Sequence, residues 1–164
     1  MPHTMKRIFF FIALAIISIS FTSCLTGEAQ STPLIQVSKS VYRATLAGVH
    51  DTISLADTIH VGDTLRVPLM LYGNYNNLTE FTVTVDAAEL DIRLLVDSAC
   101  LALLDTTSAP DKAYLRFVND VYVFPTDMQY VPKKTGSLKI SMTLASTAGE
   151  KYSPLGAWFI LEVR

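Results

Sequence analysis

The sequence predicts an all-β protein, an antiparallel β-sandwich. Three observations predict it: apolar residues recur at every second position in several runs, turn-forming residues separate the runs, and almost no stretch has the 3.6-residue period of a helix. Alternation of this kind gives each strand one face for a core and one face for water. Several short strands punctuated by turns are typical of a sandwich or barrel.

The clearest alternation covers residues 65–72, 81–86 and 138–145, and each of these runs is a predicted strand. Pro68 predicts that its strand is a sheet edge or starts at a bulge, because proline donates no backbone hydrogen bond. Residues 98–104 form the one short stretch that favours a helix. Shorter runs rich in β-branched and aromatic residues predict further strands at 42–46, 53–60, 92–96, 114–124 and 158–163.

Turn residues separate the predicted strands. Gly62-Asp63, residues 73–77, residues 109–111 and residues 149–154 are rich in Gly, Pro, Asn and Asp. A longer loop is predicted over residues 125–136, which begin with Pro125 and end with Gly136.

The first residues have the layout of a secretory signal. Lys6 and Arg7 precede an apolar run, Ile8 to Ile17, which gives way to small and hydroxyl residues before Cys24. The apolar run is too short for a permanent transmembrane helix, which needs about 20 residues. We therefore expect residues 1–23 to be a signal peptide, followed by a polar tether at 24–33 and a single domain at 34–164.

The pair Ser23-Cys24 resembles the lipobox of bacterial lipoproteins, particularly the looser form of the Bacteroidota, although Phe21 stands where Leu is usual. The resemblance implies cleavage before Cys24 and lipidation of that residue with a diacylglycerol and a third acyl chain, palmitate being the expected kind of chain. Several acyl chains anchor a protein stably, whereas one is marginal. We expect an exported protein held at the outer membrane, on its periplasmic or surface face; a plain secreted protein is the alternative.

Residues 61–92 carry a second resemblance. Val61-Gly62-Asp63 leads into a strand with Val67-Pro68, a later alternating strand ends at Asp86, and Leu90-Asp91-Ile92 follows. This order is similar to the first third of cohesin-type and related bacterial immunoglobulin-like sandwiches. The resemblance implies an antiparallel immunoglobulin-like β-sandwich. The second half departs from the cohesin pattern, so a dockerin-binding role is not carried over.

Composition limits the function classes. Cleavage would leave 164 − 23 = 141 residues with 11 basic and 15 acidic side chains, a formal charge of 11 − 15 = −4. The longest basic cluster is Lys133-Lys134, so we expect no nucleic-acid partner. Cys100 lies among apolar residues and is expected to be a small buried hydrophobe.

The sequence lacks the patterns of catalytic and metal sites. His50 and His60 are the imidazoles left after cleavage, and neither belongs to a metal-binding or hydrolase motif. The acids Asp86, Glu89 and Asp91 are interpreted as turn and strand-end residues. We therefore predict a protein that is not an enzyme and holds no metal or cofactor, and keep a small envelope hydrolase as an alternative.

A recurring triplet of Asp, Ser or Thr, and a small aliphatic residue or Thr resembles the O-glycosylation sequon of exported Bacteroidota proteins. The alternative is that the Asp side chains start turns by accepting backbone N–H groups. Alternation predicts that Thr64 points outward, and the apolar residues after Ser98 predict that Ser98 is covered. The candidate hydroxyls are Thr52, Thr58, Thr64, Ser98 and Thr106.

Aromatic rings offer large flat surfaces with little entropy loss, so they are the candidate ligand contacts, with packing in the core or on a sheet face as the alternative. The candidates are Trp158, Tyr72, Tyr75, Tyr122 and Tyr130. Tyr75, in the polar stretch 73–77, and Tyr130, in the predicted loop 125–136, are expected to be exposed, and Trp158 is the third candidate for stacking on a glycan. We expect a lipid-anchored, non-catalytic binding module for a glycan or protein partner. A structural or accessory subunit of a surface assembly, pairing through sheet edges, is the second interpretation.

Overall fold

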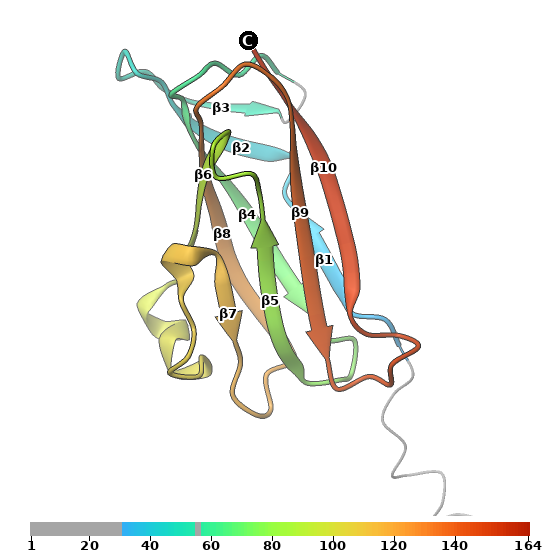
Figure 1. The fold of residues 1–164 in the computed structure, drawn as a ribbon. Helices are drawn as coiled ribbons and strands as arrows, with labels where there is room; N and C mark the ends of the chain where they lie inside the picture. The colour runs from blue at the N-terminus through green and yellow to red at the C-terminus, as the bar shows by residue number, and fades with distance from the viewer. Residues whose placement is uncertain (1–30, 55–56) are drawn as a thin grey trace, which may run out of the picture.

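The computed structural model describes residues 31–54 and 57–164. They form two antiparallel sheets packed face to face, so the predicted all-β sandwich is confirmed (Figure 1). The predicted signal peptide, Cys24 and residues 25–30 of the predicted tether lie outside the described residues. In the part of the chain that the structure describes, no helix is long and apolar enough to cross a membrane.

Sheet A contains six strands, five of them in the order β3-β2-β4-β8-β6. The sixth, β1, pairs with the same edge of β4 as β2 does, farther along that strand. Its strands are β1 (Leu34–Val37), β2 (Ser40–Ala44), β3 (His50–Ser54), β4 (Thr64–Tyr72), β6 (Leu90–Leu95) and β8 (Val123–Pro132).

Sheet B contains four strands in the order β10-β9-β5-β7. They are β5 (Leu78–Thr84), β7 (Tyr114–Arg116), β9 (Gly136–Ser146) and β10 (Leu155–Val163). Two short 3₁₀ helices, η1 (Ser98–Leu103) and η2 (Pro110–Lys112), connect β6 to β7. The predicted helical stretch is thus η1, which Asp97 caps by accepting the N–H of Ala99.

The core lies between the sheets and is built from the predicted alternation. β4 and β9 bury every second residue, while the intervening residues face outward; β5 does so from Phe81 on, after a bulge between Leu78 and Glu80. Burial of one large aliphatic side chain stabilises a fold by about 1.5–3 kcal/mol, so these three strands supply much of the driving force. Their buried members are Leu65, Val67, Leu69, Leu71, Leu78, Phe81, Val83, Leu138, Ile140, Met142 and Leu144.

The predicted loop over residues 125–136 is wrong, because residues 123–132 form β8 in the middle of sheet A. Its inward positions are buried and include Phe124, Thr126, Met128 and Tyr130. The hydroxyl of Thr126 donates to the carbonyl of Leu95 at 3.0 Å, which satisfies a polar group inside the sandwich. Prolines near both ends of the strand and this buried threonine interrupt the alternation of apolar and polar residues by which a strand is predicted.

The prediction that Pro68 marks an edge strand is wrong, because β4 has neighbours on both sides. Pro68 C=O accepts a hydrogen bond from Ser38 N–H at 2.9 Å. In an extended strand both backbone groups of a residue point to the same side, so the nitrogen of Pro68 also faces Ser38. The missing donor therefore falls where β1 has ended and β2 has not begun, and where no ladder hydrogen bond is lost.

Two other predicted strands were too long. The run 53–60 corresponds to β3, which ends at Ser54, and the run 114–124 contains β7, a turn, and the start of β8. Phe117 and Val121 are buried in that turn, so their apolar character reflects the core without the regular geometry of a strand.

Candidate functional site

An open hollow of about 390 Å³ lies at one end of the sandwich, and three tyrosines line it. Tyr72 ends β4, Tyr75 lies in the β4–β5 turn, and Tyr122 precedes β8; Asn74 and Val123 complete the lining. The pairing of β4 with β8 brings these segments together, with Tyr72 opposite Val123. Gly73 N–H also donates to the carbonyl of Tyr122 at 2.8 Å. We call this hollow the tyrosine pocket.

The β4–β5 turn holds Tyr75 in an unfavourable backbone conformation. Asn74 and Tyr75 have φ values of 49° and 72°, and Asn76 N–H donates to Gly73 C=O at 3.1 Å, which closes a turn of type I′. The second central position of such a turn favours glycine, and a bulky residue there costs about 1–2 kcal/mol. The Tyr75 side chain recovers little by packing, because the residue is 87% exposed.

Close backbone contacts fix this turn. A Cβ atom on Gly73 would lie 1.9 Å from the carbonyl oxygen of Asn76, so only glycine fits there. The buried Asn76 side chain donates its amide to the carbonyls of Gly73 and Asn74, each at 3.2 Å. The pocket wall is therefore formed before any ligand arrives.

The first described residues bind the same turn. Asn74 Nδ2 donates to the carbonyl of Thr32 at 2.6 Å, and Asn76 Nδ2 donates to Ser31 Oγ at 3.1 Å. The hydroxyl of Ser31 donates to the carbonyl of Asn74. The chain therefore enters the domain beside the tyrosine pocket.

The three predicted stacking residues do not form one site. Tyr75 is exposed, as predicted, and Trp158 is 64% exposed on the outer face of β10, in the other sheet. The predicted exposure of Tyr130 is wrong: this residue is fully buried on β8, so its ring is not accessible to a ligand. Tyr72 and Tyr122, which are among the five aromatic candidates but were not expected to be the exposed ones, are the partners of Tyr75, and the pairing of β4 with β8 brings them together.

Burial also sets the chemistry of Tyr130. Loss of solvent raises the pKa of its phenol far above the usual value, so the ring stays neutral. Within the described residues its hydroxyl has no hydrogen-bond partner. Tyr130 therefore behaves as a core aromatic residue.

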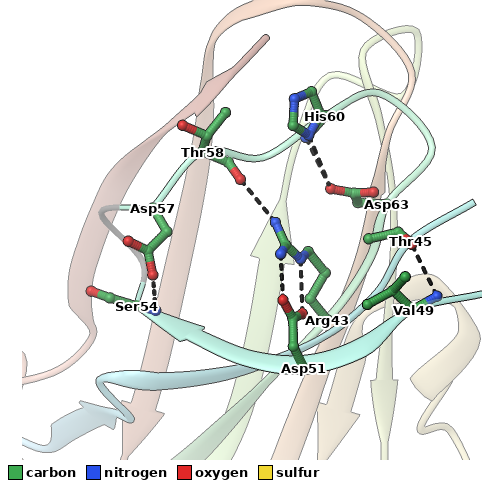
Figure 2. Close-up of polar contacts among 9 residues, drawn as sticks. All are labelled: Arg43, Thr45, Val49, Asp51, Ser54, Asp57, Thr58, His60 and Asp63. Atoms are coloured by element: carbon green, nitrogen blue, oxygen red, sulfur yellow. Dashed lines mark hydrogen bonds and ion pairs between the residues drawn. The ribbon is translucent and has the colours of Figure 1, made fainter. Parts of the chain in front are cut away.

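A polar cluster lies at the opposite end of the sandwich, around the β2–β3 hairpin (Figure 2). Arg43 Nε donates to Asp51 Oδ1 at 2.9 Å, its Nη2 pairs with Asp51 Oδ2, and its Nη1 donates to the carbonyl of Thr58 at 3.1 Å. The hydrogen bond from Arg43 lowers the pKa of the Asp51 carboxyl. The guanidinium is thus committed to holding the 57–63 segment against the hairpin, which is a structural task.

The Asp residues of the repeated triplets mostly act in turns. Four of the five accept a backbone N–H: Asp57 from Ser54 at 2.7 Å, Asp63 from His60 at 3.0 Å, Asp97 from Ala99 at 2.8 Å, and Asp105 from Thr107 at 2.9 Å. Asp51 is paired with Arg43 instead. These contacts support the turn-forming interpretation without testing modification of the hydroxyl groups.

The five candidate hydroxyls differ in exposure. Ser98, predicted to be covered, is exposed, because η1 buries none of its residues. Thr64 lies on the outward face of β4, as predicted, and is half-buried there. Thr52, Thr58 and Thr106 are exposed.

The two remaining histidines and Cys100 lie outside the tyrosine pocket. His50 and His60 are both exposed, and the described residues contain no group of three or more His, Cys, Asp or Glu that could hold a metal. Cys100 is half-buried, less covered than predicted, and lines an open hollow with Arg66 and Asp127. Arg66 Nη2 and Asp127 form an ion pair across that hollow.

No protein-family model matches the chain, and a search of curated proteins finds no similar sequence. Among solved structures, the chain is similar to a DUF4466 family protein from Parabacteroides merdae, with a TM-score of 0.44 and 10% sequence identity. The match covers 80% of this chain and 43% of that protein, so the chain spans less than half the length of its structural neighbour.

Proposed function

We propose that this protein is a non-catalytic binding module of the cell envelope, anchored by lipid on Cys24, and that it takes a glycan in the tyrosine pocket. The observation that carries the proposal is Tyr75, held at φ 72° with its ring exposed. Backbone strain that no packing compensates is characteristic of functional positions. A ring presented in this way beside two others gives a surface for a ligand.

The chemistry of the pocket favours a sugar. Tyrosine rings present an apolar face to the C–H groups of a pyranose, and their hydroxyls donate and accept hydrogen bonds at the rim. The hollow of about 390 Å³ lies within the usual range for small-ligand sites. Because the turn is fixed before binding, little entropy is lost when the ligand binds.

The position of the pocket fits an envelope ligand. Ser31 lies seven positions after Cys24, with six residues between them, and an extended chain of seven steps reaches at most about 25 Å. Since Ser31 contacts the turn that carries Tyr75, a lipid on Cys24 would keep the pocket close to the membrane. We therefore place the protein at the outer membrane, with a membrane-proximal glycan as its partner.

The order of the strands supports an immunoglobulin-like assignment of the sandwich. Strands β1–β2, β4, β8 and β6 take the places of A, B, E and D, and β10, β9 and β5 take those of G, F and C. The β3 hairpin and the η1–η2–β7 segment are additions to that plan. This assignment concerns the fold alone, and the proposed ligand is argued from the tyrosine pocket.

Glycan binding is tested with a panel of immobilised bacterial and host oligosaccharides. We expect the wild-type chain to bind at least one of these oligosaccharides. Tyr75→Ala and Tyr122→Ala should each weaken that binding about tenfold or more, as loss of a central aromatic contact does. Tyr42→Ala is the matched control, since Tyr42 is 54% exposed at the opposite end of sheet A. The proposal fails if no glycan binds, or if Tyr42→Ala weakens binding as much as Tyr75→Ala.

The anchor has its own test. Cys24→Ser is expected to abolish labelling with radioactive palmitate and to release the protein from the membrane fraction, because the acyl chains are the membrane contact. Unchanged labelling and fractionation would contradict lipidation at Cys24.

O-glycosylation of Thr52, Thr58, Thr64, Ser98 and Thr106 stays a prediction, and exposure ranks Thr64 last among them. Protein from its own host would then be heavier than protein from a host without the pathway, after correction for lipid. Equal intact masses would leave the turn-forming role of the Asp residues as the full account.

A second candidate function, a subunit of a surface assembly, is favoured by one observation. β10 ends sheet B and exposes Trp158 and Ile160 on its outer face. An apolar edge strand of this kind can pair with another chain.

A further inference from the structure

In the described part of the chain, five strands have a side without a paired neighbour, and most of them are protected against pairing. β1 has four residues, and β3 has five, with polar or charged side chains at four of them. β6 carries Asp91 and Arg93 on its outer face. Short length and charge are the usual ways to prevent a sheet edge from recruiting another strand.

β7 is covered by the chain itself. Ala109 N–H donates to Tyr114 C=O at 2.9 Å, and Ala109 C=O accepts from Tyr114 N–H at 3.1 Å. Asp105 N–H donates to Arg116 C=O at 2.8 Å. The segment between η1 and η2 thus supplies the hydrogen bonds that a further strand would supply.

β10 is less protected than these strands, although Lys139 Nζ, on β9, lies 5.4 Å from the centre of the Trp158 ring. It is nine residues long, contains no proline or lysine, and carries one charge, on Glu162. It pairs with β9 in an unbroken register, so no bulge twists its outer edge away. Trp158 and Ile160, two residues apart on the outer face, are 64% and 45% exposed.

The free backbone groups of β10 can be assigned. Arg164 N–H donates to the carbonyl of Ile59 at 2.8 Å, on the side away from β9. Backbone groups alternate in direction along a strand, so those of Gly156, Trp158 and Ile160 also point away from β9. Ile59 covers only the end of the strand, at Val163, and among the described residues no other strand pairs with this edge.

We propose that β10 pairs with β10 of a second copy of this chain, antiparallel and centred on Trp158, so that the two four-stranded sheets become one continuous sheet. This inference deepens the assembly role and does not involve the tyrosine pocket. In this register Trp158 lies opposite the same residue of the second copy, and Gly156 lies opposite Ile160. All three residues have backbone groups that face the partner, as an antiparallel ladder requires.

The strand fits a copy of itself better than an arbitrary peptide. Glu162, its one charge, falls beyond the paired segment 156–160, so no like charges oppose each other across the ladder. Gly156 has open space where a Cβ would lie, which leaves room for the large side chain of Ile160 from the second copy. The exposed tryptophan and isoleucine of each copy then cover those of the other.

The test is the molar mass of the full chain, purified in detergent and measured by sedimentation equilibrium with the detergent density-matched. We expect a dimer. Ile160→Lys places a charge beside the partner strand and is expected to give a monomer, because lysine is a common protection of natural edges. Leu101→Lys is the matched control: Leu101 is 54% exposed on η1, and this variant is expected to remain a dimer.

Ile160→Pro tests the hydrogen bonds directly. The Ile160 N–H points away from β9, so proline removes a donor needed only by the second copy, and a folded monomer is expected. If the circular dichroism of this variant shows that it does not fold, Ile160→Lys decides alone. A monomeric wild-type chain overturns the proposal, even if it captures a strand of another protein at β10. A dimer that survives Ile160→Lys overturns it as well.

Discussion

The two ends of the sandwich differ in how their side chains are paired and exposed. At the end with the β2–β3 hairpin, charges are paired: Arg43 with Asp51, Lys133 with Asp91, and Lys134 with Glu89. At the other end, tyrosine rings line an open hollow, and the most exposed of them, Tyr75, has a strained backbone conformation. A region whose polar groups are already satisfied serves the fold, whereas exposed rings held in place without packing are available to a ligand.

The same contrast separates two tyrosines. Tyr130 lies opposite Leu65, in the core beneath the charged end, whereas Tyr75 lies on a turn at the other end. Mutations that distinguish stability from binding can therefore break or sharpen the comparison between the ends.

The largest effect on stability is expected at Tyr130. Tyr130→Ala removes a fully buried ring and should lower the free energy of unfolding by about 3–5 kcal/mol, measured by urea denaturation. Tyr130→Phe is the matched control, and because the buried hydroxyl has no partner among the described residues, its loss should be neutral or stabilising. A large cost for Tyr130→Phe would show that the hydroxyl is bonded.

Gly73→Ala is expected to have the next largest effect, and to lower both the free energy of unfolding and the affinity for the glycan. The new Cβ would lie 1.9 Å from Asn76 O, so the turn must move, at a cost of about 1–3 kcal/mol. Glycan binding should fall with it, because Tyr75 and Tyr122 lose their relative positions. Gly149→Ala is the control, since nothing lies within 4 Å of its added Cβ. Unchanged binding in Gly73→Ala would separate the turn geometry from the site.

Sequence patterns predicted the fold better than the site, and the reason is physical. The period of two in residues 65–72 and 138–145 reports directly which face of each strand is buried, so β4 and β9 were found. β8 was missed because Pro125 and Pro132 imitate a loop in a strand whose buried residues include a threonine. Because of this error, Tyr130 was predicted to be exposed although it lies in the core.

The tyrosine pocket could not be derived from local patterns. Tyr75 was found because its neighbours, Gly73, Asn74 and Asn76, favour a turn. Tyr72 and Tyr122 are 50 residues apart and meet only through the pairing of β4 with β8, one strand predicted and one missed. Sites assembled across a sheet depend on register, which a single sequence does not contain.

Tyr75→Gly is expected to have opposite effects on stability and binding. Glycine adopts a φ of 72° without steric cost, so the variant should be more stable by about 1 kcal/mol, seen as a higher urea midpoint. It should also lose glycan binding with the ring. Tyr42→Gly is the comparison, because Tyr42 lies inside β2, where glycine weakens a strand. A destabilised Tyr75→Gly would show that the ring packs usefully and would remove the strain argument.

The smallest effect is expected at the charged end and depends on pH. Arg43 lowers the pKa of Asp51 in the folded state, so the ion pair adds stability above the pKa of an unfolded Asp, about 4, and loses it as the pH falls through the lower folded value. Asp51→Asn should therefore be less stable than wild type at pH 7, and the difference should shrink below about pH 4. Asp105, whose pKa is lowered by Thr107, titrates in both proteins and cancels from that difference. Glycan binding by Asp51→Asn should equal that of wild type, since the tyrosine pocket lies at the far end of β4; a parallel loss of binding would show that the two ends are coupled.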